Sequence, residues 1–160
     1  MFLFMKMRIE REAFLPIFIF GIVYGIHHFL NSLITWWFIR THSVRDAATI
    51  IIFLNLSSIV IKWVLLFIVL VIMYHVGKKL NLKANLKSII ISVLVGGFIG
   101  YFLVTLVSMP LFFIIAQREI SLNLAVAYLV GGLYASLETT SSLFFTSFTA
   151  IAIAHFRKTG

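Results

Sequence analysis

The fold is decided by residues 122–156, which read LNLAVAYLVGGLYASLETTSSLFFTSFTAIAIAHF. This stretch is apolar and long enough to cross the hydrocarbon core of a bilayer, about 30 Å thick, as an α-helix. Its only acid is Glu138, which lies near the middle. Because a carboxylate at that depth is costly and rare in membrane helices, we expect Glu138 to have a polar partner.

Three further apolar stretches precede it, over about residues 14–39, 47–76 and 88–116. The four together predict an all-α, polytopic membrane protein, a four-helix transmembrane bundle with short connectors that forms one domain over residues 1–160. The composition agrees, because 62% of the residues are hydrophobic, 11% are charged and the mean hydropathy is +1.11. A soluble domain of this composition would lack the polar residues to cover its surface.

The polar run at residues 138–142 leaves two alternatives for the fourth stretch. Residues 122–137 and 143–156 are each too short to span alone, so the stretch could be a helix broken at the midplane, as in secondary transporters. Small residues nevertheless recur at helical spacing through the whole stretch. We therefore favour one continuous, tilted helix, which would be longer than the bilayer requires.

Basic residues are distributed unequally between the two ends of the predicted bundle. The N-terminal segment, the connector after the second stretch and the C-terminus carry Lys6, Arg8, Arg11, Lys78, Lys79, Lys83, Lys87, Arg157 and Lys158, whereas the other end carries Arg40, Arg45 and Arg118. The positive-inside rule then predicts that both termini are cytoplasmic and that the chain is a multi-pass protein of the cell membrane. Because these bases flank apolar stretches, anionic lipid headgroups explain the net charge of +8, and we expect no nucleic-acid partner.

Small residues form stripes at helical spacing in three of the four stretches. Such stripes let helix backbones approach closely, and hydroxyl groups can form hydrogen bonds across the contact. The candidate packing positions are Gly21 and Gly25 in the first stretch, Gly96 and Gly100 in the third, and Gly132, Ala135, Thr139 and Ser142 in the fourth, where Thr146 and Thr149 continue the pattern. They predict a compact bundle or a docking face for partner helices.

Polar residues also occur at one depth in all four stretches. This predicted midplane cluster consists of His27, His28, Lys62, Tyr101 and Glu138. We expect Glu138 to face protein, with Lys62 or a central histidine as its nearest ionisable partner. One interpretation is a structural ion pair or hydrogen-bond network that fixes helix register, and the other is a path for protons or ions.

A weaker hypothesis concerns His75 and His155, which end the second and fourth stretches at the predicted cytoplasmic face. Two histidines on facing helices of a bundle can ligate haem, although interfacial histidines are also common. The chain has no cysteine, which excludes thiolate metal sites, and it contains no phosphate-binding loop, HExxH motif or nucleophile elbow. We therefore expect no metal, no cofactor and no enzymatic activity.

Three functional hypotheses follow from these patterns. The leading one is a non-catalytic accessory or structural subunit of a larger membrane complex, in contact with lipid and with other subunits or further copies of itself. The second is a small oligomeric transporter or channel that uses the cluster around Glu138 and Lys62. The third is a membrane haem protein of the b type.

Overall fold

The computed structural model describes residues 10–41, 44–80, 82–116 and 122–159. These form four long helices, α1 (Arg11–Thr41), α2 (Val44–Lys79), α3 (Leu82–Ala116) and α4 (Leu122–Thr159), and the described part of the chain contains no strand. Each helix is long and apolar enough to cross a membrane. The predicted fold class, an all-α bundle of four membrane-spanning helices, is confirmed.

The fourth helix is continuous, as favoured from its sequence. α4 runs without interruption through the polar residues 138–142. The side chains of Ser141 and Ser142 donate hydrogen bonds to the carbonyl oxygens of Leu137 and Glu138, one turn earlier. Because each hydroxyl is satisfied within its own helix, these residues do not have to break the helix.

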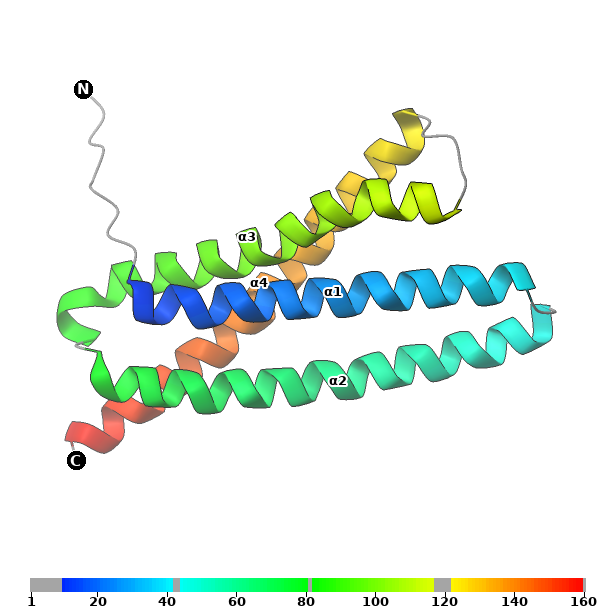
Figure 1. Cartoon of the computed structure of the whole chain (residues 1–160). Helices are drawn as coiled ribbons and strands as arrows, with labels where there is room; N and C mark the ends of the chain where they lie inside the picture. The colour runs from blue at the N-terminus through cyan, green and yellow to red at the C-terminus, as the bar shows by residue number, and fades with distance from the viewer. Residues whose placement is uncertain (1–9, 42–43, 81, 117–121, 160) are drawn as a thin grey trace, which may run out of the picture.

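The helices form a ring in which α1 contacts α2 and α3, and α4 contacts the same two helices from the opposite side. Figure 1 shows α4 crossing behind the other three at a steep angle. Its C-terminal end lies beside α2, where Gly77 contacts Ile151, and its N-terminal end lies beside α3, where Gly132 contacts Thr105. As a result, α2 and α4 diverge toward the end of the bundle opposite the C-terminus.

The closest helix–helix approach joins α1 to α3, which run in the same direction (Figure 1). A Cβ atom at Gly21 would lie 2.9 Å from the carbonyl oxygen of Gly97, and one at Gly25 would lie 2.9 Å from Cβ of Val104. A Cβ atom at Gly100 would overlap the carbonyl oxygen of Phe18. The predicted stripes of α1 and α3 therefore form a glycine seam in which one backbone contacts the other directly.

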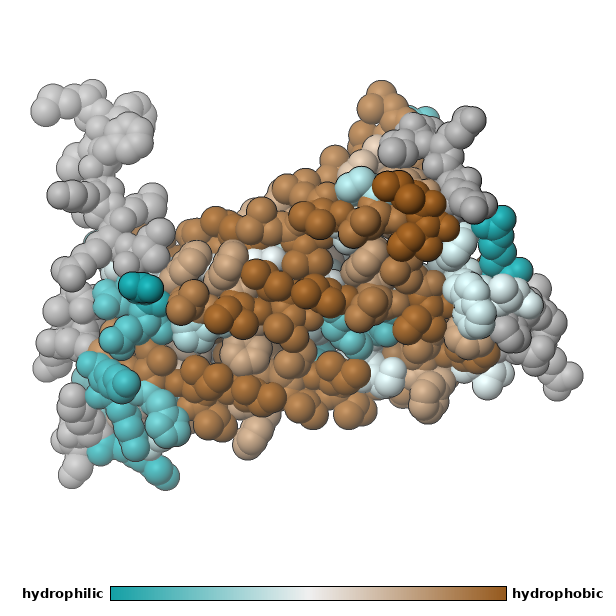
Figure 2. Space-filling view, in the orientation of Figure 1, coloured by the Kyte–Doolittle hydropathy of each residue, from teal (hydrophilic) through white to brown (hydrophobic). Residues whose placement is uncertain are grey.

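The apolar core occupies the half of the bundle that holds the C-terminus. Its most buried side chains come from all four helices and are Ala13, Ile17, Val69, Met73, Ile89, Val93, Leu143, Ala150 and Ile151. On the outside, large apolar side chains are exposed along the length of the helices. Figure 2 shows a mostly brown surface, with hydrophilic residues gathered mainly at the ends and a smaller hydrophilic patch between the helices near the middle. This is the surface expected of a protein whose solvent is lipid.

The packing stripe of α4 lies partly where the sequence predicted it. Thr139 is buried and Gly132, Ala135 and Ser142 are half-buried, but Thr149 is exposed. The side chains buried along the rest of α4 belong to a neighbouring stripe of small and apolar residues, namely Ser136, Thr140, Leu143, Ser147, Ala150 and Ala154. Both stripes have helical spacing, and the oblique crossing over α2 and α3 buries the second one along most of its length.

Candidate functional site

An ion pair joins the middle of α2 to the middle of α4. Nζ of Lys62 donates a hydrogen bond to Oε1 of Glu138 over 2.8 Å. The lysine side chain is 27% exposed, and that of the glutamate is 58% exposed. Among the partners considered for Glu138, Lys62 is therefore the one in contact. Both charges lie at the depth of the hydrocarbon core, where pairing removes most of the cost of an isolated charge.

The first predicted histidine, His27, belongs to a separate network between α1 and α2. Its Nε2 lies 3.2 Å from Oγ of Ser58 and 3.4 Å from Nδ2 of Asn31, and Nδ2 of Asn31 also donates to Oγ of Ser58. Asn31 was not singled out in the sequence, although it lies one turn after His27 on the same face of α1. This network bonds α1 to α2 without using the ion pair.

Aromatic rings connect the cluster to α3. The ring of Tyr101 lies 6.1 Å from that of Tyr24 and meets the imidazole of His28 edge-on at the same distance. Tyr101 is only 2% exposed, so it fills the space between α1 and α3 at the level of the ion pair. Tyr24 also escaped the sequence prediction. Its position one turn before His27 and His28 was the signal that could have identified it.

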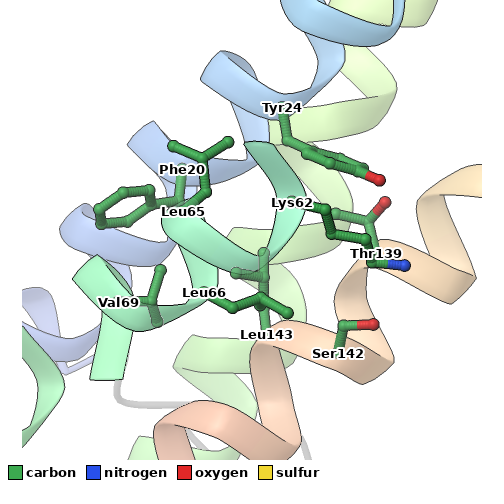
Figure 3. A pocket seen from close by; sticks show the side chains of 9 residues that line it. All are labelled: Phe20, Tyr24, Lys62, Leu65, Leu66, Val69, Thr139, Ser142 and Leu143. Carbon is green, nitrogen blue, oxygen red and sulfur yellow. The ribbon is translucent and has the colours of Figure 1, made fainter. Parts of the chain in front are cut away.

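A small void lies next to Lys62, between α1, α2 and α4 (Figure 3). It measures about 20 Å³, which is room for one water molecule. Its surface is entirely apolar, and the residues that line it are Phe20, Tyr24, Lys62, Leu65, Leu66, Val69, Thr139, Ser142 and Leu143. Val69 and Leu143, which line this void, also belong to the apolar core of the half that holds the C-terminus.

A much larger polar cavity lies on the other side of Glu138, between α1, α3 and α4. It measures about 390 Å³. The polar side chains that line it are His28, Ser32, Tyr101, Thr105, Ser108, Tyr128, Tyr134 and Glu138. The hydroxyl groups of Ser108 and Tyr128 lie 3.1 Å apart and bridge α3 to α4 within this wall. We call this space the Glu138 cavity.

A second polar cavity, of about 370 Å³, lies between α1 and α2. Its polar lining consists of His28, Asn31, Ser32, Thr35, Trp36, Asn55 and Ser58. His28 and Ser32 line both cavities, so the two lie on either side of the same segment of α1. These two polar cavities lie in the half of the bundle that carries the α1–α2 and α3–α4 connectors, and the buried apolar core lies in the other half.

The structure joins four of the five residues of the predicted midplane cluster in two contacting pairs, and the fifth, His27, contacts Ser58 outside that cluster. Lys62 binds Glu138, His28 contacts Tyr101, and His27 binds Ser58. These residues were identified from the sequence because each lies near the middle of its apolar stretch. Which pairs form depends on how each helix is rotated, and that information came only from the fold.

The haem hypothesis receives no support from the positions of His75 and His155. His75 lines a groove between α1 and α2, and its Nδ1 lies 2.8 Å from the carbonyl oxygen of Val71. The opposite face of α2 packs on α4, where a Cβ atom at Gly77 would lie 2.9 Å from Cα of Ile151. Helices in such close contact leave no slot for a porphyrin. Among the described residues, no group of three or more His, Asp or Glu side chains could hold a metal ion.

Comparison with known proteins finds no matching family model, no matching curated protein and no matching solved structure. The fold and the ion pair define the chain as a multi-pass membrane protein with a polar site at mid-depth.

Proposed function

We propose that this chain is a non-catalytic subunit of a larger assembly in the cell membrane, built with other subunits or with further copies of the chain. The single observation that carries the proposal is the 58% exposure of Glu138. In a bilayer, that exposed surface would meet hydrocarbon unless a partner, or water in the Glu138 cavity, covers it. A charge at mid-depth costs at least about 2.5 kcal/mol on insertion scales, so membrane proteins normally turn it toward protein or water.

The surface around Glu138 has the character of a helix-docking face. Tyr134, Ser141 and Phe145 lie one or two turns away on the same side of α4, and all three are exposed. Exposed aromatic rings beside a polar group offer a partner helix both apolar contact area and a hydrogen-bond partner. The connectors between the four helices span only a few residues, which is consistent with a subunit that lacks a catalytic domain.

A matched pair of substitutions tests this proposal. Phe145 and Phe67 are 69% and 66% exposed, but only Phe145 lies on the face of Glu138. Phe145→Ala should reduce the fraction of chain found in the assembly, because it removes contact area from the interface. Phe67→Ala, on α2, should leave assembly unchanged.

The readout is the protein mass measured by light scattering after mild detergent extraction from the native membrane. A wild-type mass equal to that of one 18.2 kDa chain would contradict the proposal. Equal loss of assembly in both variants would place the interface elsewhere.

A second candidate function, a small oligomeric transporter or channel, is favoured by the Glu138 cavity. Glu138 lines that cavity together with hydroxyl-bearing residues of α1, α3 and α4, which is the kind of surface that a half-channel presents to an ion. A transporter should move an ion across reconstituted liposomes and lose that flux in Glu138→Gln. A structural subunit should show no flux of its own.

A further inference from the structure

We propose that the Glu138 cavity is a water-filled vestibule that opens to one side of the membrane only and admits small monovalent cations to the free oxygen of Glu138. The cavity is lined by α1, α3 and α4 of this chain alone, so the inference does not depend on the proposed assembly. From Glu138, the lining extends toward the end of the bundle that carries the α1–α2 and α3–α4 connectors, as far as Ser32, Ser108 and Ala127.

The first argument is the difference between the two sides of Glu138. Toward the connectors, the cavity has a volume of about 390 Å³ and a lining rich in hydroxyl groups, both of which favour water. Toward the termini, the space that adjoins Lys62 and Thr139 measures about 20 Å³, and Val69 and Ile151 beyond it are at most 2% exposed. The groove that contains His75, of about 530 Å³, is lined by α1 and α2 and not by α4. Water can therefore reach the carboxylate from one side and not from the other.

The second argument is the sign of the charge that faces the cavity. Glu138 lines it, whereas Lys62 does not. Lys62 binds Oε1, and no hydrogen bond from a described residue reaches Oε2. The lining also includes hydroxyl-bearing residues, among them Ser32, Thr105 and Tyr134, whose oxygens can contact a cation. A small cation, and not an anion, matches this surface.

Access can be measured with single cysteines, because the native chain has none. Gly131 lines the cavity, and a Cβ atom there would meet nothing within 4 Å, so Gly131→Cys should fold normally. It lies about 10 Å along α4 from Glu138, at 1.5 Å per residue. In sealed vesicles of both orientations, a membrane-impermeant maleimide should label Gly131→Cys from one side only. Labelling from both sides, or from neither, would overturn the vestibule.

Two controls separate the vestibule from general exposure. Val130→Cys lies beside Gly131 and is 59% exposed but does not line the cavity, so it should face lipid or protein and remain unlabelled. Ser147→Cys is a near-isosteric change at a fully buried position below the ion pair and should also remain unlabelled. Ser32→Cys provides a second probe of the cavity from α1 if Gly131→Cys does not fold. It should label from the same side as Gly131→Cys.

The charge preference can be measured at the same cysteine with methanethiosulfonate reagents carrying a trimethylammonium or a sulfonate group. At Gly131→Cys, the rate with the cationic reagent divided by the rate with the anionic reagent should be severalfold higher than the same ratio for a free thiol in solution. Replacing Lys62 with Met should raise this ratio to about tenfold, because the carboxylate then acts alone at about 10 Å. Replacing Glu138 with Gln and Lys62 with Met together should abolish the preference. No preference in the Gly131→Cys protein, or one that survives the double replacement, would overturn the cation site.

The mass of the same Gly131→Cys protein separates this inference from the proposed function. A single chain that labels from one side would retain the vestibule and contradict the assembly. An assembly in which the cysteine stays unlabelled would retain the subunit and contradict the vestibule.

Discussion

At the scale of single residues, Lys62 and Glu138 each depend on the other as the partner of a charge. The two groups come from different helices and meet over 2.8 Å where α2 and α4 cross. Neither side chain is fully buried, so the pair combines a structural contact with access from the Glu138 cavity. Removing one partner leaves the other as an unpaired charge at mid-depth.

We predict that Glu138→Gln destabilises the bundle by about 1–3 kcal/mol, less than for a fully buried pair because the carboxylate is 58% exposed. Adding Lys62→Met should recover part of that loss, since no lone charge then remains. Thermal unfolding in a defined detergent gives the three stabilities. Ser141→Ala, one turn away and bonded only to its own helix, is the control and should change little. A double variant less stable than Glu138→Gln would contradict a coupled pair.

From the sequence, it was easier to predict which residues belong to the polar site than to predict which of them contact each other. Glu138 and Lys62 stood out because charged residues are rare inside apolar stretches, and the middle of a stretch sets their depth. Tyr24, Asn31 and Tyr128 were missed, because tyrosine and asparagine near helix interfaces are common enough to carry little signal. The rotation of each helix decides which polar groups meet, and small-residue stripes constrain that rotation only partly.

At the scale of helices, the glycine seam between α1 and α3 is the most sterically constrained contact. Gly21 and Gly100 place backbone against backbone, so any side chain there must push two helices apart. Gly131, on α4, is the opposite case, because the space around it is open. The two kinds of glycine look alike in the sequence and differ only in what lies opposite.

We predict that Gly100→Ala destabilises the bundle by about 1–3 kcal/mol through overpacking, because the new methyl group would overlap the backbone carbonyl of Phe18. Gly131→Ala adds the same methyl group where nothing lies within 4 Å. It should be neutral, or slightly stabilising through the higher helix propensity of alanine. Thermal unfolding of both variants beside the wild type measures the difference. Equal behaviour of the two would mean that α1 and α3 do not pack through Gly100.

Small-residue spacing predicted the packing faces of α1 and α3 but could not decide which face of α4 is buried. Gly21, Gly25, Gly96 and Gly100 were assigned to packing faces from spacing alone, and all four are buried between α1 and α3. α4 offers two small-residue stripes side by side, one through Thr139 and Ser142 and another through Ser136 and Thr140. Spacing cannot choose between them, because the choice depends on the angle at which α4 crosses its neighbours.

At the scale of the whole molecule, the two ends of the bundle differ in packing and in charge. The half near the C-terminus is closed by the apolar core, while the other half holds both polar cavities. Most of the basic residues belong to the closed end, which carries the α2–α3 connector and the C-terminus (Figure 1). Orientation in the membrane therefore decides which compartment the Glu138 cavity faces.

We predict that the C-terminus is cytoplasmic and that the Glu138 cavity opens to the outside. The reason is the excess of Lys and Arg at the closed end, which includes Lys78, Lys79 and Arg157 against Arg40 and few others opposite. Reporter fusions that are active only in the cytoplasm or only outside it, placed after Gly160 and within residues 41–46, should score on opposite sides. Impermeant labelling of Gly131→Cys should then occur from the side of the 41–46 fusion. Both fusions on one side would contradict the four-span topology, and a C-terminus outside would reverse the orientation and turn the cavity toward the cytoplasm.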